Sequence, residues 1–196
     1  MSKFALLRSI LFVMAGTLLP SFVYAHVGAG DTSGLMHGLA HPVSGMDHVC
    51  AMLAVGLWAA QMGGRSVWAV PLTFVSVMAL GGVLPMLGIG LPFVEQGIVL
   101  SVLLLGVLIA ASVRLPLILS SSIVGLFALW HGHAHGAEMP TLSSGITYAI
   151  GFMMATASLH IIGIVFGFWM QRLAHERIIH TAGASIALCG VYLAAT

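Results

Sequence analysis

Residues 67–87 read VWAVPLTFVSVMALGGVLPML and include no charged side chain. A helix needs about 20 apolar residues to cross the hydrocarbon core of a bilayer, and this stretch is long enough. The rest of the chain has the same character, because 60% of its 196 residues are hydrophobic and only 6% are charged. Since soluble domains carry about 25% charged residues, the sequence indicates a membrane protein whose apolar surface is covered by lipid.

Similar apolar stretches precede and follow residues 67–87, and glycine, proline or arginine residues separate them. Such residues commonly end helices. The pattern predicts an all-α membrane protein, a polytopic bundle of about six transmembrane helices. We expect these spans at 44–62, 67–87, 94–113, 116–136, 143–171 and 177–195. The segment before the first span, residues 26–43, is expected to form a short re-entrant helix.

The first 25 residues have the pattern of a cleavable secretory signal peptide. Basic residues stand at positions 3 and 8, residues 10–19 are apolar, and residues 23–25 read VYA, which ends in a small residue. This is the order of regions in such a signal, and the apolar run is short for a membrane span. We therefore expect a leader at 1–25 and a mature transmembrane domain at 26–196. The alternative is an uncleaved first helix.

The basic residues that follow the leader all fall in loops on one side of the predicted bundle. They are Arg65, Arg114, Arg172 and Arg177. By the positive-inside rule that side is cytoplasmic. Acidic residues fall toward the other side, with Glu176 as the exception: Asp31, Asp47, Glu95 and Glu138. We expect a bacterial inner-membrane protein with a periplasmic mature amino end.

Histidine is the unusual residue of this sequence. Its ten copies outnumber both the five acidic and the six basic residues. A membrane-spanning chain avoids polar groups that have no role. Two clusters stand out, HGLAHPVSGMDH at 37–48 and WHGHAHGAE at 130–138. One opens the first predicted span and the other closes the fourth, so both should lie at the periplasmic end.

Spacing within the first cluster predicts which side chains point together. His41 and His48 lie seven residues apart and would share a face of one helix. Pro42 suits a first helical turn or a kink, which leaves His37 less firmly aligned. Asp47 points about 100° away from His48 and could either bind an ion or orient an imidazole.

In the second cluster His131, His135 and Glu138 fall at spacings of four and three, again on one face, while His133 points to the opposite side. Imidazole combined with carboxylate suits nickel, cobalt, copper or zinc better than calcium or magnesium. Any single histidine of these clusters could have a purely structural role, as a hydrogen-bonded residue at a helix end. Six histidines and two carboxylates at one depth favour a metal site instead.

Further histidines are secondary candidates for the metal path. His26 would combine a free α-amine with an imidazole, unless the mature terminus is simply disordered. His160 lies within the fifth predicted span and would be either an inner relay or a histidine that is hydrogen-bonded to a neighbouring helix. The complete secondary set is His26, His37, His133 and His160.

The two clusters resemble the signatures of the HupE/UreJ family of nickel and cobalt permeases. The signature H-P-x-x-G-x-D-H matches residues 41–48, and an aromatic residue followed by H-x-x-A-H-G-x-E matches residues 130–138. Trp130 departs from the usual Phe, but no ligand is lost. The resemblance implies that a set of six residues recognises the metal: His41, Asp47, His48, His131, His135 and Glu138.

The leading interpretation is a permease rather than an enzyme. It would take up Ni²⁺ or Co²⁺ from the periplasm through a site between the first and fourth helices. By the resemblance, the ion would supply maturation of metalloenzymes such as hydrogenase or urease. The transported ion is then the substrate, and no tightly bound cofactor is expected. The expected partners are the ion and the lipid bilayer. The sequence leaves the oligomeric state open, including a homo-oligomer.

Other function classes are disfavoured by what the sequence lacks. No G-x-x-x-x-G-K-[ST] motif is present, so the chain does not itself hydrolyse nucleotide, and no ATPase subunit is evident. The net charge of +1 gives no reason to expect nucleic acid. The alternative function is a membrane-embedded, histidine-box di-metal oxidase or hydroxylase, and a third is a periplasm-facing metal sensor or storage protein. Measurements of metal uptake and of oxygen consumption would distinguish the permease from the oxidase or hydroxylase.

Overall fold

The computed structural model describes residues 31–139, 145–172 and 176–196. The predicted leader and His26 lie outside these residues, so the leader stays a prediction. In the described ranges the regular structure is entirely helical. The helices are α2 (Asp31–Ser44), α3 (Met46–Met62), α4 (Ser66–Met86), α5 (Val94–Ala110), α6 (Leu117–Ala137), α7 (Gly145–Arg172) and α8 (Glu176–Ala195).

Each predicted span coincides with one helix, from α3 to α8, with ends that differ by three residues at most. Four of these helices are long and apolar enough to cross a membrane: α4, α6, α7 and α8 from Arg177 onward. The pair α2 and α3 passes the same test together, and α5, at 17 residues, is a shorter apolar helix about 25 Å long. The molecule is a multi-pass helical membrane protein.

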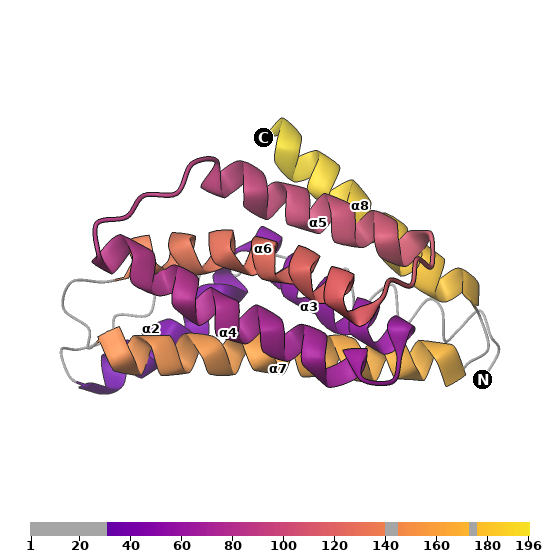
Figure 1. The fold of residues 1–196 in the computed structure, drawn as a ribbon, viewed down its shortest axis with the longest axis horizontal. Helices are drawn as coiled ribbons and strands as arrows, with labels where there is room; N and C mark the ends of the chain where they lie inside the picture. The colour runs from indigo at the N-terminus through magenta and orange to yellow at the C-terminus, as the bar shows by residue number, and fades with distance from the viewer. Residues whose placement is uncertain (1–30, 140–144, 173–175) are drawn as a thin grey trace.

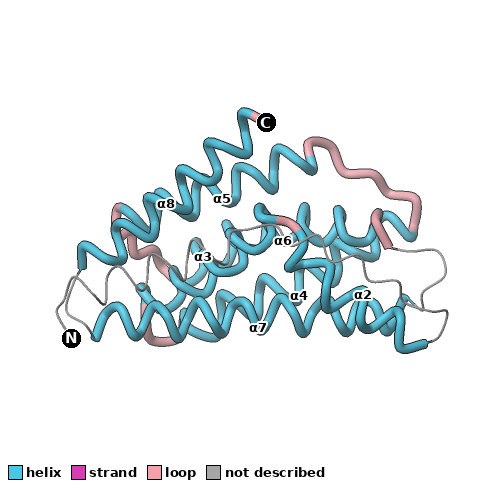
Figure 2. The backbone as a smooth tube through the Cα atoms, turned by 180° about the vertical axis from the view of Figure 1, so that it is seen from behind, coloured by secondary structure: helices cyan, strands magenta, loops and turns pink. Residues whose placement is uncertain are grey.

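The helices pack where small residues let their backbones meet. A Cβ atom on Gly132 of α6 would lie 2.0 Å from the Met78 carbonyl oxygen of α4, so only glycine fits there. A Cβ atom on Gly106 of α5 would lie 2.3 Å from α8, and one on Gly56 of α3 would lie 2.2 Å from α7. Close glycine contacts are typical of helix pairs in membranes. As Figures 1 and 2 show, α5 and α8 form one side of the bundle, and α4, α6 and α7 lie beneath them.

One end of the bundle, here called the arginine end, carries Arg65, Arg114 and Arg172. Hydrogen bonds join its helices. Trp58 Nε1 of α3 donates to the Val113 carbonyl after α5 (2.9 Å), and Gln171 Nε2 of α7 donates to the Ala60 carbonyl (3.0 Å). In Figure 1 the short links from α3 to α4 and from α5 to α6 lie at this same end.

The first predicted span differs from the expectation in one respect. The helix breaks at Gly45, whose φ of −101° and ψ of 126° are extended, and α2 and α3 meet at a bend of 83°. Pro42 lies inside α2 rather than at the start of the span. The prediction that His41 and His48 share a face of one continuous helix is therefore wrong, because the break places them on different helices.

Candidate metal centre

The outermost part of the site joins α2 to the end of α6. His41 Nε2 lies 2.9 Å from Glu138 Oε2, and the His41 and His135 rings are 4.8 Å apart. Each of these three residues offers one ligand atom, and the three atoms all lie within 4.8 Å of one another. The side chains of Glu138 and His41 are 59% and 29% exposed, so water reaches this part of the site.

His48, at the start of α3, is oriented by its neighbour. Asp47 Oδ1 accepts hydrogen bonds from the His48 backbone N–H and from His48 Nδ1, each at 2.8 Å. The ring proton then resides on Nδ1, which leaves Nε2 as a free lone pair that is buried without a hydrogen-bond partner. A carboxylate behind an imidazole is the usual arrangement around a bound metal.

Gly45 explains why the first motif contains a glycine. A Cβ atom at this position would lie 2.6 Å from Asp47 Oδ1 and 3.1 Å from His48 Nδ1. Any larger residue would displace the pair that orients the imidazole. The glycine thus allows the helix break and the Asp47–His48 contact at the same place.

The histidines of α6 present a similar lone pair toward α3. His131 Nδ1 donates to the Phe127 carbonyl at 3.0 Å, and its Nε2 is buried without a partner. His135, only 2% exposed, has no hydrogen-bond partner at either ring nitrogen. Because these residues are one turn apart on α6, both face the same neighbours.

Contacts between rings link these imidazoles in a row that runs inward. The His135 and His48 ring centroids are 4.3 Å apart, and those of His48 and His131 are 5.1 Å apart. Together with the contact between His41 and His135, the row is His41, His135, His48 and His131. All six residues of the predicted primary set therefore come together, contributed by α2, α3 and the end of α6.

The secondary candidates behave differently from one another. His133 faces the link between α4 and α5, where its Nε2 lies 3.1 Å from both Leu91 N and the Ile89 carbonyl. His37 has a buried Nδ1 without a partner, but no ring contact joins it to the six within the described ranges. His160 lies deeper, with its ring 5.1 Å from that of Phe74.

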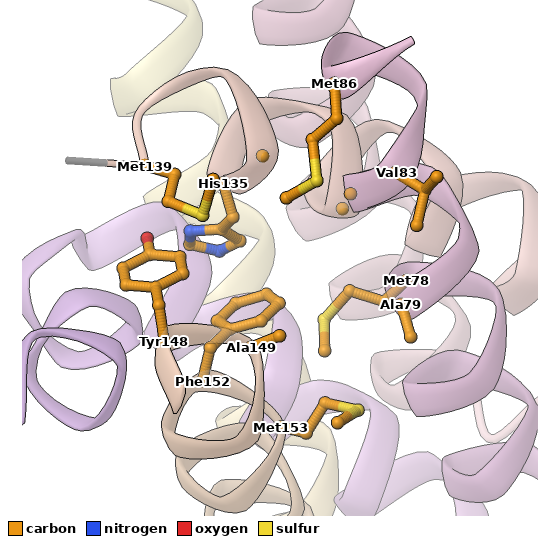
Figure 3. Close-up of a pocket in the computed structure, with 13 residues that line it drawn as sticks. Met78, Ala79, Val83, Met86, His135, Met139, Tyr148, Ala149, Phe152 and Met153 are labelled. Carbon is orange, nitrogen blue, oxygen red and sulfur yellow. The ribbon is translucent and has the colours of Figure 1, made fainter. Parts of the chain in front are cut away.

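Aromatic residues of α7 complete the wall of the site. They lie outside both sequence motifs, so the sequence patterns did not predict them. The Phe152 ring lies 4.0 Å from that of His135, and the Tyr148 ring lies 6.0 Å from that of His41. Beside them is a cavity of about 70 Å³ between α4, α6 and α7. Figure 3 shows its four methionine side chains together with His135; they are Met78, Met86, Met139 and Met153.

Fold and site together define a helical membrane protein with a row of contacting histidines, a candidate metal site, at one end of its bundle. The chain belongs to the HupE/UreJ family, because the family model described as HupE / UreJ protein matches residues 13–193. It is also 46% identical over 180 residues to protein HupE of Rhizobium leguminosarum bv. viciae. This alignment covers 92% of this chain and 94% of that protein. No solved structure matches. The membership predicted from the two motifs is confirmed.

Proposed function

We propose that this protein is an inner-membrane permease that takes up a divalent transition metal, nickel or cobalt, from the periplasm for metalloenzyme maturation such as that of hydrogenase or urease. One observation carries the proposal. Imidazoles from three helices contact one another in the membrane domain, with buried nitrogens that have no protein partner. A buried polar atom without a partner costs about 1–3 kcal/mol, and a bound cation would offset that cost.

The donor set suits the proposed ions. Neutral imidazole nitrogen and carboxylate oxygen are good ligands for nickel and cobalt, and calcium or magnesium would prefer oxygen alone. The outer three residues, His41, His135 and Glu138, already place their ligand atoms within 4.8 Å of one another. His48 and His131 then offer two further nitrogens along the inward row.

Exposure is highest at the outer residues of this row and lowest at its inner end, which supports capture from the water side. The side chain of Glu138 is exposed and that of His41 is partly exposed. His135 is 2% exposed, the side chain of His48 is 13% exposed, and His131 is fully buried. An ion would exchange its water for protein ligands step by step. A divalent cation that enters a negative interior gains about 4.6 kcal/mol at 100 mV, from about 2.3 kcal/mol per charge, so uptake needs no nucleotide hydrolysis.

The test compares uptake of radioactive nickel and cobalt by cells that produce the parent, His48→Ala or His131→Ala. Both variants should transport at the background of cells without the protein, since each loses an imidazole nitrogen from the middle of the row. Membrane abundance, measured by immunoblot, should equal that of the parent.

His180→Ala is the matched control, because His180 is also a histidine in a helix but bonds to the Ala110 carbonyl at the arginine end. It should transport like the parent. Parental uptake by both His48→Ala and His131→Ala would contradict the proposed site. Metal-dependent oxygen consumption by the purified parent without metal uptake would favour the oxidase alternative.

A further inference from the structure

The row of imidazoles stops at His131, but another unpaired histidine lies beyond it. His160, in the middle of α7, is 1% exposed, and neither of its ring nitrogens has a hydrogen-bond partner in the part of the chain that the structure describes. The Phe74 ring of α4 contacts both histidines, with its centroid 5.4 Å from that of His131 and 5.1 Å from that of His160. Phe74 itself is fully buried.

A hydroxyl group and a thioether lie near the same level of the bundle as His160. Thr156 precedes it by one turn on α7, and its Oγ1 donates to the Met78 sulfur at 3.8 Å. Met78 follows Phe74 by one turn on α4. Two contacts, Phe74 with His160 and Met78 with Thr156, therefore join the same faces of α4 and α7. All of these side chains are fully buried or nearly so.

The imidazole of His160 thus lies one helical turn from a thioether and a hydroxyl group, on the facing sides of two helices. An apolar side chain would fill the position of His160 without leaving two buried nitrogens unpaired. Imidazole with thioether is a ligand set of intermediate softness, which suits nickel, cobalt or copper and not magnesium or calcium.

The same cavity that borders His135 also borders Met78 (Figure 3). It gives the inner group a second connection to the outer site besides the Phe74 ring. The outer site has carboxylates and several imidazoles, whereas the inner group has one imidazole and neutral ligands. An ion would be held less tightly at the inner group, as onward release requires.

We propose that His160, with Met78 and Thr156, is a second, inner binding station for the transported divalent metal, linked to the outer histidines by the ring of Phe74, which contacts both His131 and His160. This inference rests on the proposed permease function. Transfer to the station is an exchange of ligands, in which a metal–nitrogen bond at His131 is replaced by one at His160, with no change in the oxidation state of the metal.

The experiment uses the purified full-length protein in lipid nanodiscs, with cobalt as the probe. Visible absorption of bound Co²⁺ reports its ligands, and equilibrium dialysis reports its stoichiometry. The parent should bind two ions per chain and His160→Gln one. His48→Ala combined with His135→Ala should retain only the weaker inner ion, and addition of His160→Gln should remove it.

Transport by the same variants in proteoliposomes supplies an independent readout. His160→Gln should lower the maximal rate of cobalt uptake at least about tenfold and leave KM unchanged, because capture at the outer site is intact. The outer variants should instead lose uptake at all accessible cobalt concentrations. His180→Gln, which makes the same chemical change at the arginine end, should match the parent.

Met78→Leu tests the inner station even if the His160 variant does not fold. Leucine keeps the apolar volume and removes only the sulfur. It should abolish the sulfur-to-cobalt absorption band and slow transport. The inner station is overturned if His160→Gln binds as many ions and transports as fast as the parent while the outer variants fail. Failure of the parent itself to bind or transport cobalt and nickel would overturn the permease function as well.

Discussion

The two ends of this helix bundle use polar side chains in opposite ways. At the arginine end Trp58 bonds to a backbone carbonyl of the link after α5, and Gln171 and His180 each bond to a backbone carbonyl of a neighbouring helix. At the other end, here called the histidine end, His48 and His135 keep buried nitrogens without partners and contact other imidazoles. Within a membrane an unpaired polar group is costly. Among the described residues Gln61 Oε1 is also buried without a partner at the arginine end, but the unpaired atoms of the histidine end are mostly imidazole nitrogens. The arginine end therefore mainly holds helices together, and the histidine end is arranged for a ligand.

Sidedness is the most decisive test of this contrast, because the expected result is all or none. In a protein whose own cysteines, Cys50 and Cys189, are replaced by serine, Glu138→Cys should react with a membrane-impermeant maleimide in intact cells. Arg65→Cys should react only after the cells are permeabilised. The reason is the concentration of basic residues at the arginine end. Labelling of Arg65→Cys alone in intact cells would place the histidine end in the cytoplasm and remove the basis for periplasmic capture.

Asp47→Ala should have the next largest effect. Its loss frees the His48 ring to rotate and to move its proton to Nε2, so we expect about 10–100-fold weaker apparent affinity for cobalt in transport assays. Asp47→Asn, which keeps an oxygen that accepts from Nδ1, should fall between alanine and the parent. Equal affinity of Asp47→Ala and the parent would show that His48 does not need its neighbour.

The smallest effect is expected for His133→Gln, although this histidine stands inside the second motif. Its nitrogen bonds to the link between α4 and α5, so the change should alter cobalt uptake less than about twofold and lower stability by about 0.6 kcal/mol, the average for such a bond in a membrane protein. Thermal unfolding in detergent measures the stability. His133 Nδ1, like His131 Nε2, is buried without a partner among the described residues, so His133 differs by lying outside the row of contacting rings. If His133→Gln abolished uptake while the protein stayed folded, membership of that row would not decide which histidines carry the metal.

Much of the architecture follows from local sequence, because a bilayer demands long apolar stretches and only glycine, proline and charge end them. The ends of α3 to α8 were predictable for this reason, as was the opposite direction of His133 on α6. Spacings of three and four on that helix also placed His131, His135 and Glu138 together, since α6 is continuous.

The geometry of the site depended on tertiary structure. Spacing alone put His41 and His48 on one helix, but the break at Gly45 separates them, and they meet again only through His135. Likewise, nothing in the order of residues shows that Phe74 contacts both His131 and His160. Sequence periodicity predicts the face of its own helix on which a side chain lies. Which side chains it meets is decided by the close packing of glycine-lined helices that are distant in sequence.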